Sequence, residues 1–551
     1  MLAGWMAAGS AASGAEHFVQ NREDLARIEA ALPPQAPARP AKPRRLLIFT
    51  LNVGYGGHAS IAYANEAFTR MGRRTGAFDA VVSNDPAVFA RESLSQFDAV
   101  FFNNTVGNCF TNAEWRQSLA EFVMGGGGLM GVHGTSVAFT RWPGAVEDWP
   151  EFGLIIGARG ANHKESDEHA WLKLEDPEHP VTRAFGGQDF DYREEFFRVH
   201  EPYSRERLRV LLSLDTAKTD MDQGQPRGNT TRADNDYAIA WAASYGRGRV
   251  FYCTMAHNAR VFWDARMLEF YLAAAQFVLG DLPAPTTPSA RLTPAVRAQE
   301  RLGWRLGLAA GHPARLSLSE TIDHAARLGL SDVWGADDQL VSKETPRPLG
   351  PALSRSELEA VRLKLAAQGM RLVAFQVQDF PAAQAERRSL FEFGRKLGVE
   401  VLIGHPPTAA LGEIGRLCDQ FNLRLALHDC TEATAEYAQL EKLRERCQTL
   451  GGRMGAGGCL RCWSRAGVDP AQAVRALNQR LFTVRLNNSP GAGQPASPAT
   501  MLAEARSLGL GPTLFALELS EGDTEAVTQA RQRMQQFNQL TLQLAPGPAK
   551  P

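Results

Sequence analysis

The chain of 551 residues lacks long apolar runs, an excess of charge of one sign, and a dense set of cysteines. No run reaches the roughly eighteen apolar residues that a transmembrane helix requires, so the sequence predicts no transmembrane segment. The net charge of -1 argues against nucleic acid and against a polybasic membrane patch as partners. Seven cysteines are too few for a disulfide scaffold, and the odd number leaves at least one thiol without an intramolecular partner. A hydrophobic share of 44% is ordinary for a globular protein of several domains.

Residues 1–44 are predicted to be a leader and a proline-rich linker. The stretch "MLAGWMAAGSAASGAE" is small and apolar, but it lacks the positively charged start of a signal peptide. The following "ALPPQAPARPAKPRR" has the composition of a linker. The leader is either the remnant of an export signal or a disordered segment, so both an exported or periplasmic and a cytoplasmic location stay open.

Residues 45–281 alternate between strand-like and helix-like segments. The strand-like runs are "LLIFT" (46–50), "DAVFFNN" (98–104), "LMGVHG" (129–134) and "GRVFYCTMAHN" (248–258). Two segments with helical patterns, 113–128 and 264–280, lie among them. This alternation predicts an α/β domain built on a parallel sheet.

Polar side chains follow several of these strands. His58 comes after the first strand, Asn104 and Thr105 end another, and His133 and His257 follow two more. A single histidine of this kind is usually a buried structural residue. Because ligands bind at the carboxyl ends of parallel strands, the whole set predicts a pocket for a small polar molecule.

The same domain resembles the ThuA-like family, of the trehalose-utilisation type. The stretches that carry the resemblance occur in the family's order and include "LLIFTLNVGYGGHASI", "GGGGLMGVHG", "FGLIIGARGANHK", "YREEFFRV" and "AIAWAASYGRGRVFYCTMAHNARVF". The resemblance implies a flavodoxin-like fold related to class I glutamine amidotransferases, and a sugar or an oxidised keto-glycoside as substrate. It places His133 at the family's elbow motif, Glu194 and Glu195 at its acidic pair, and His257 at its late histidine.

Glutaminase activity is not expected, because thioester formation needs a thiolate at the elbow and this chain has His133 there. We expect His133, His257 and Glu195 to be catalytic, because imidazole and carboxylate groups suit acid–base chemistry near neutral pH. We expect His58, Asn104, Thr105 and His163 to bind the substrate. A His/His/Glu set also suits zinc, so a divalent metal in this domain is a second hypothesis, and no other cofactor is indicated.

A second proline-rich linker, 282–303, precedes a regular pattern over 304–541, followed by a predicted disordered tail at 542–551. Eight strand-like runs separated by charged helical segments predict a (β/α)8 TIM barrel. The runs are 305–310, 330–335, 371–377, 399–404, 423–429, 452–458, 481–488 and 513–520, of which the glycine-rich sixth has the weakest pattern.

This region resembles the xylose-isomerase-like sugar phosphate isomerases and epimerases, most clearly in "WSRAGVDPAQAVRALNQRLFTVRLNN". The resemblance implies metal ligands at strand ends, but the matching positions hold other residues. Of these positions only Glu518 keeps a carboxylate; the others are His405, Cys459, Cys462 and Arg485. We therefore expect no metal-dependent isomerisation, since hard oxygen ligands are largely missing.

The Cys459–Cys462 pair leaves three interpretations open: a degenerate site, a rebuilt soft zinc site with His405 or His428, and a redox dithiol.

Taken together, the sequence predicts a carbohydrate-metabolism protein whose chemistry lies in the first domain and whose partner is a small carbohydrate. One alternative is a non-catalytic carbohydrate-binding or scaffold protein. A further alternative is a metal-dependent sugar isomerase or epimerase in the barrel. The sequence does not decide between a monomer and a homo-oligomer.

Overall fold

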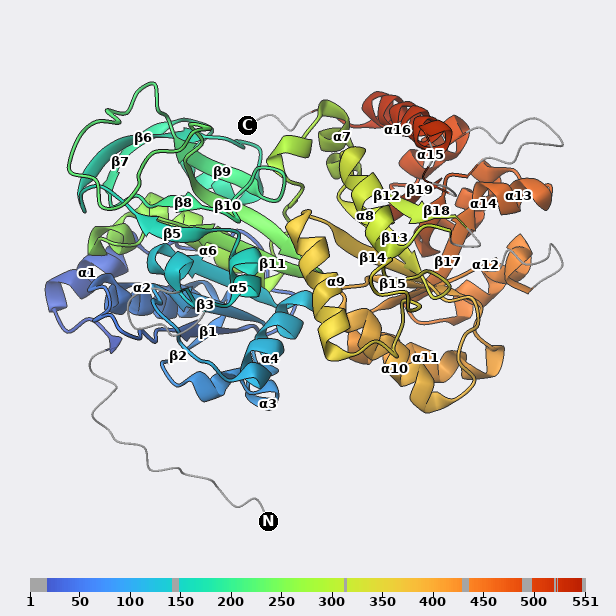
Figure 1. The fold of residues 1–551 in the computed structure, drawn as a ribbon, viewed down its shortest axis with the longest axis horizontal. Coiled ribbons are helices and arrows are strands. Elements are labelled where there is room, and N and C mark those ends of the chain that lie inside the picture. The colour runs from blue at the N-terminus through green and yellow to red at the C-terminus, as the bar shows by residue number, and fades with distance from the viewer. Residues whose placement is uncertain are drawn as a thin grey trace, which may run out of the picture.

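The structure is a computed structural model that describes residues 17–140, 148–311, 315–428, 436–487, 498–519, 522 and 524–547. An open sheet covered by helices lies on the left of Figure 1, in blue to green, and a closed barrel lies on the right, in yellow to red. No helix in the described part of the chain has the length and hydropathy of a membrane span.

The N-terminal sheet has nine strands in the order β2-β1-β3-β4-β11-β10-β9-β6-β7. The strands from β2 to β11 in this order are parallel, and the remainder are antiparallel. Their bounds are β1 Arg45–Phe49, β2 Asp79–Ser83, β3 Ala99–Asn103, β4 Gly128–Val132, β6 Glu168–Leu174, β7 Phe190–Glu194, β9 Arg209–Leu214, β10 Ala238–Tyr245 and β11 Gly248–Cys253. A separate two-stranded sheet pairs β5 Arg159–Asn162 with β8 Arg198–His200.

Strict alternation along β1 divides the core of this domain into two layers. Leu46 and Ile48 pack into one hydrophobic cluster, whereas Leu47 and Phe49 pack into another on the opposite face. Helices α2 Ser60–Thr75 and α6 Ala265–Leu279 supply side chains to the first cluster, and α4 Ala113–Met124 and α5 Pro150–Ile156 supply the second. The sheet is therefore buried on both faces, and ligands reach it at the ends of its parallel strands.

The predicted leader and linker contain more structure than the sequence suggested. A helix, α1 Arg22–Ala31, begins at Asn21, whose side chain accepts hydrogen bonds from the first turn. Ile28 is fully buried against the first cluster, and Ala38 exchanges two hydrogen bonds with the Gln276 side chain. These partners lie far along the chain, so local composition could not reveal them. Residues 1–16 lie outside the described residues.

The C-terminal barrel closes eight parallel strands in chain order, which confirms the predicted fold. The strands are β12 Trp304–Ala310, β13 Asp332–Ala336, β14 Arg371–Gln376, β15 Val401–Gly404, β16 Arg424–Leu427, β17 Met454–Cys459, β18 Leu481–Arg485 and β19 Thr513–Leu519. The surrounding helices include α8 Leu318–Arg327, α9 Arg355–Ala367, α10 Gln384–Lys396, α11 Leu411–Phe421, α12 Leu440–Thr449, α13 Leu460–Arg465, α14 Pro470–Leu477, α15 Pro498–Ser507 and α16 Thr524–Leu544. The glycine-rich strand β17 is real, and its glycines make room for neighbours. A Cβ at Gly458 would lie 2.5 Å from the Trp463 ring.

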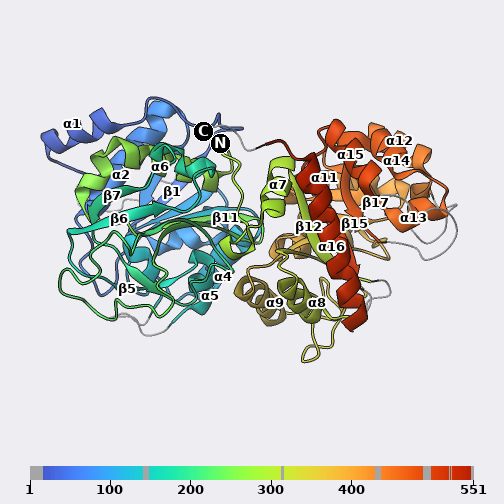
Figure 2. The same cartoon turned by 90° about the horizontal axis from the view of Figure 1, so that it is seen from above.

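The predicted second linker is partly helical. Helix α7 Pro294–Leu302 begins at Thr293, whose hydroxyl accepts from Val296 N, and has Pro294 in its first turn. Proline is well tolerated there because that N–H needs no helical partner. In the view from above, α7 lies between the two domains, and it packs against α16 (Figure 2). Helix α16 extends to Leu544, beyond the predicted barrel end, and residues 548–551 lie outside the described part.

A buried ion pair joins the two domains. Arg362 Nε on α9 donates to Glu151 Oε1 on α5 at 3.0 Å, and both side chains are almost fully buried. The Tyr245 hydroxyl donates to the same carboxylate oxygen at 2.5 Å. A second, exposed pair joins Arg355 to Glu114 across the same interface at 2.7 Å.

Replacing Arg362 with methionine should lower the free energy of unfolding by about 3–5 kcal/mol, because the buried Glu151 carboxylate would lose its positively charged partner. Arg355→Ala is the matched control and should cost less than about 1 kcal/mol, since that pair is exposed. Urea unfolding followed by circular dichroism measures both. Equal effects of the two variants would show that burial does not govern this interface.

A cluster of charged side chains in the barrel, Glu400 with Arg305, Arg371 and Arg424, should make the stability of the protein depend on pH. Burial alone would raise the pKa of Glu400, but Arg305, which lies 2.6 Å away, outweighs it together with Arg371 and Arg424 and lowers the pKa to about 2. The stabilisation is therefore complete above about pH 4.5 and is lost as the pH falls toward 2. Glu400→Gln should flatten the decline of stability over this range, whereas Glu386→Gln, at an exposed position, should leave it unchanged. Thermal unfolding at several pH values tests this, and parallel curves for Glu400→Gln and the parent would contradict it.

Candidate functional site

His133 occupies a tight elbow directly after β4. Its backbone is left-handed, with φ 42°, and its side chain is fully buried. Its Nδ1 lies 2.7 Å from the carbonyl oxygen of Thr254, and its own carbonyl accepts a hydrogen bond from the Tyr252 hydroxyl at 2.6 Å. Because a carbonyl only accepts, Nδ1 carries the proton, and Nε2 faces the pocket.

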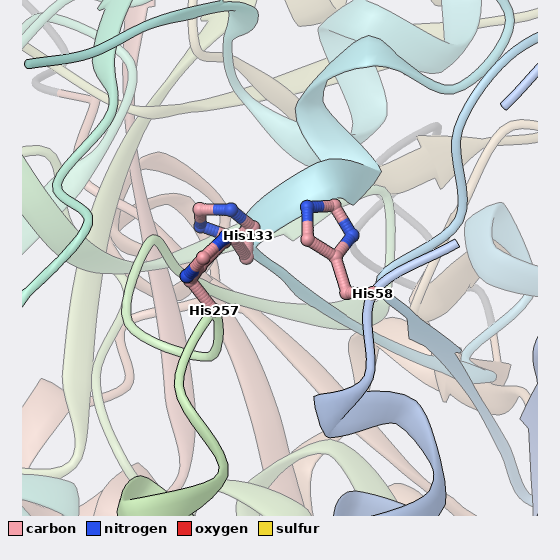
Figure 3. A group of neighbouring side chains, drawn as sticks. All are labelled: His58, His133 and His257. Atoms are coloured by element: carbon pink, nitrogen blue, oxygen red, sulfur yellow. The ribbon is translucent and has the colours of Figure 1, made fainter. Parts of the chain in front are cut away.

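Two more histidines meet His133 there. His58 lies in the loop between β1 and α2, and His257 lies in the loop after β11 (Figure 3). The ring centroids of His58 and His133 are 4.9 Å apart, and each lies 5.3 Å from that of His257. One nitrogen of each ring lies within 4.8 Å of a nitrogen of each of the other two. Three loops that are distant in sequence thus bring their imidazoles together.

Glu195, directly after β7, places its carboxylate beside this cluster. Its Oε1 lies 3.4 Å from His133 Nε2, and its Oε2 lies 3.6 Å from His257 Nε2. His163 approaches from the loop after β5, with its Nδ1 3.2 Å from Oε2. The preceding residue, Glu194, points elsewhere: it accepts from the backbone N–H of Asn258 at 3.0 Å and so holds the loop that carries His257. Burial raises the pKa of Glu194 to about 8.

Four of these side chains, His58, His163, Glu195 and His257, line a cavity of about 480 Å³. The residues around it are Tyr55, His58, Val106, Gly134, Val137, Ala161, Asn162, His163, Glu195, Phe197, Arg227, Gly228 and His257. The volume lies within the range of about 300–1,000 Å³ that is typical of small-molecule sites.

Burial sets the charge state of the pocket. It lowers the pKa of His58 to about 3, with help from His133 and His257. It also lowers the pKa of His133, against the opposing effect of Glu195. Burial would raise the pKa of Glu195, but its interactions with His133, His257 and His163 outweigh it and lower this pKa. At neutral pH the pocket therefore combines neutral His58 and His133 rings with an ionised carboxylate.

Asn104 has a different position from the one expected of a substrate-binding residue. It is fully buried, with φ 55°. Its Nδ2 donates to the Ala256 carbonyl at 2.9 Å and to Ser60 Oγ at 3.2 Å, and its Oδ1 accepts from Gly134 N at 3.0 Å. These three partners are close neighbours of the three histidines, so Asn104 fixes the loops that carry them. Thr105, also expected to bind substrate, is fully buried and does not line the cavity.

The residues that line the cavity without being predicted from the sequence include Tyr55, Phe197 and Arg227. The Tyr55 hydroxyl lies 3.3 Å from His58 Nε2, and the Phe197 ring packs on the His133 ring with centroids 3.9 Å apart. Arg227 reaches the cavity from a polar loop whose backbone pairs with His163. Tyr55 and Phe197 lie within three residues of predicted site residues, and this proximity was the only available signal.

The barrel positions form a separate group. Glu518 Oε2 accepts from Asn487 Nδ2 at 2.7 Å and lies 3.7 Å from Arg485 Nη1, and its Oε1 lies 3.8 Å from Arg461 Nη1. Arg485 also donates to Gln376. His405 directly follows β15. Guanidinium groups thus stand around the one remaining carboxylate, where a cation would be repelled.

Cys459 and Cys462 lie together with His428. One ligand atom of each residue lies within 4.8 Å of the others. Cys459 Sγ donates to Asn487 Oδ1 at 3.3 Å, and burial raises the pKa of the Cys459 thiol. Cys462 is disulfide-bonded, so its sulfur is not available as a thiolate ligand.

Asn104→Gly keeps the left-handed backbone but removes the three side-chain hydrogen bonds, so it should lower the free energy of unfolding by about 2 kcal/mol or more. Thr105→Val is the control. The Thr105 hydroxyl has no hydrogen-bond partner among the described residues, so losing it should cost less than about 1 kcal/mol. Thermal denaturation of both variants tests the assignment, and an Asn104→Gly protein as stable as the parent would refute it.

Comparisons with known proteins agree with this architecture. Residues 45–278 match the family model ThuA, described as trehalose utilisation. A ThuA-like protein from Bacteroides uniformis is 22% identical with a TM-score of 0.36, over 44% of this chain and 94% of its own. No curated protein matches the chain.

Two sugar epimerases are also similar to part of the chain. The 3-keto-D-glucoside 4-epimerase from E. coli is 10% identical with a TM-score of 0.34, over 43% of this chain and 99% of its own. The D-psicose 3-epimerase from Clostridium cellulolyticum is 12% identical with a TM-score of 0.35, over the same shares. Likenesses at this level carry no functional information. The family match and the strand order together show that the N-terminal part of this chain is a ThuA domain, joined to a closed eight-stranded parallel barrel of the TIM type.

Proposed function

We propose that this protein is a carbohydrate-metabolising enzyme whose reaction takes place in the ThuA domain. The observation that carries the proposal is that Glu195 and His257 line one cavity of about 480 Å³ and that the buried His133 lies 3.4 Å from the Glu195 carboxylate. The family description, trehalose utilisation, supports a sugar as substrate, and the resemblance of the domain supports a keto-glycoside as one form of it.

The roles of these residues follow from their exposure and contacts. Glu195 stands beside three imidazoles and is the group placed to accept a proton from a substrate hydroxyl or carbon. The His257 side chain is 27% exposed at the cavity wall, where it can exchange protons with substrate and solvent. His133 is fully buried and fixed by Thr254, so it orients the carboxylate and the substrate. His163 and His58 contact the substrate from the cavity walls.

Glutamine hydrolysis does not fit this site. The elbow residue is His133, and the nearest candidates for a thiol nucleophile, Cys109 and Cys253, are both buried. Burial raises the pKa of each thiol to about 12, so neither supplies a thiolate at neutral pH.

We propose no isomerisation in the barrel. Arg485 and Arg461 hold positive charge next to Glu518, and the neighbouring positions offer an amide and buried sulfurs instead of carboxylates. Mg²⁺ and Mn²⁺ prefer oxygen ligands, which this group does not supply. The barrel then acts through packing or through binding of a partner or glycan.

Glu195→Gln should reduce kcat/KM by about 10²–10⁴-fold on the best substrate among disaccharides and their 3-keto derivatives, because it removes the proton acceptor. Glu518→Gln is the matched control in the barrel and should leave kcat/KM within twofold. Steady-state kinetics with and without Mn²⁺ measure kcat/KM, and thermal unfolding of each variant checks that it is folded.

Loss of activity with Glu518→Gln, and dependence on Mn²⁺, would move the reaction to the barrel. Binding of sugars by the parent protein without turnover would favour the alternative of a non-catalytic carbohydrate-binding or scaffold protein. Full activity of Glu195→Gln would refute the assigned site.

A further inference from the structure

We infer that His58, His133 and His257 bind a divalent transition metal of the zinc type, with its open coordination position toward the cavity. This inference deepens the proposed function and rests on the same pocket. It replaces the His/His/Glu set suggested by the sequence with three imidazoles. His58 becomes a ligand instead of a substrate contact, His257 becomes a ligand instead of a proton-exchanging group, and Glu195 remains the proton acceptor.

Each of the three rings has one buried nitrogen that makes no hydrogen bond among the described residues. For His133 this nitrogen is Nε2, which lies 3.4 Å from Glu195 Oε1. His133 Nδ1 donates to the Thr254 carbonyl, so Nε2 of the neutral ring carries no proton and offers a lone pair. This Nε2 is buried and makes no hydrogen bond among the described residues. Donation of the second ring N–H to a backbone carbonyl is the arrangement that orients most histidine ligands of metals.

The other two rings repeat the pattern. His58 Nε2 lies 3.3 Å from the Tyr55 hydroxyl, and its Nδ1 is buried without a partner. His257 Nε2 lies 3.6 Å from Glu195 Oε2, and its Nδ1 is likewise buried without a partner. Each of these three neighbouring rings therefore holds a buried nitrogen that makes no hydrogen bond among the described residues.

Such an arrangement is costly unless something binds there. A buried polar atom without a partner costs about 1–3 kcal/mol, and here three lie together. Water could satisfy some of them, but a single cation satisfies all three lone pairs at once. The adjacent Glu195 carboxylate adds a negative charge, which further favours a cation over a neutral ligand.

The spacing is close to that of a bound ion. One nitrogen of each ring lies within 4.8 Å of a nitrogen of each of the other two, whereas nitrogens bound at about 2.0–2.1 Å in a tetrahedron are about 3.4 Å apart. Inward movement of the rings by about an ångström closes the site. Only His133 is fully buried, so the partly exposed His58 and His257 can make this movement.

Ligand chemistry narrows the choice of metal and explains what it would do. Three imidazoles favour zinc and its neighbours in the transition series over Mg²⁺ and Ca²⁺, which prefer oxygen. Three protein ligands and an open position are typical of catalytic zinc sites, whereas structural sites use four. The open position faces the cavity, where a hydroxyl or carbonyl oxygen of a sugar would bind and be polarised.

The full-length protein, stripped with a chelator, should bind one Zn²⁺ per chain in isothermal titration calorimetry, and elemental analysis should confirm the stoichiometry. His133→Asn and His257→Asn should each weaken binding at least 100-fold. Asparagine suits the left-handed backbone at His133, and His257 tests the site at a less buried position. Tyr55→Phe should weaken binding about tenfold, since it removes the partner that orients His58.

Two control variants separate this site from its neighbours. His163→Asn keeps the pocket but changes no proposed ligand, and Cys459→Ser alters the cysteine group of the barrel; both should bind zinc within threefold of the parent. Co²⁺ in place of Zn²⁺ should give visible absorption bands that are absent in His133→Asn. This readout does not depend on activity.

Failure to bind zinc stoichiometrically, or equal affinity of the parent and both histidine variants, would overturn the inference. Loss of zinc only in Cys459→Ser would place the metal in the barrel and also overturn it. Full turnover of sugars by metal-free protein would reject the metal and leave the proposed function intact. Zinc binding without turnover of any sugar would keep the metal and reject the proposed enzyme.

Discussion

The site depends on one buried amide. Asn104 bonds through one side chain to Gly134, Ala256 and Ser60, which are near neighbours of His133, His257 and His58. Ser60 Oγ also donates to the Ala256 carbonyl at 2.7 Å, which closes the network. These hydrogen bonds link three segments that follow separate strands and fix their positions relative to one another. The bonds of Asn104 therefore fix the backbone next to each of the three histidines.

The polar side chains of the histidine cluster and those at the barrel positions differ in their hydrogen bonding. In the ThuA domain, three imidazole nitrogens lack partners among the described residues although they are buried. In the barrel, the residues at the former ligand positions bond to one another: Asn487 joins Glu518 to Cys459, and Arg485 joins Gln376.

The junction between the domains contains more ordered structure than its composition suggests. Proline-rich segments were interpreted as linkers, yet Pro294 lies in the first turn of α7, and Ala38 is held by Gln276. The buried pair of Glu151 and Arg362 then joins the domains through a contact with little access to solvent. Proline content alone cannot distinguish a linker from a helix start, because both use its fixed backbone angle.

The sequence by itself determined the two fold types and the positions of the histidines at strand ends. Alternation along β1 and the eight repeated strand and helix units are local patterns, and burial on two faces enforces them. Only the tertiary structure decided the role of Asn104, the grouping of His58 with His133 and His257, and the contact of Tyr55 with His58. The first two depend on contacts between residues far apart in the chain, such as Asn104 and Ala256, which are 152 residues apart, whereas the Tyr55 contact with His58 spans three residues. Such contacts are set by the packing of the whole sheet, so no local pattern in the sequence encodes them.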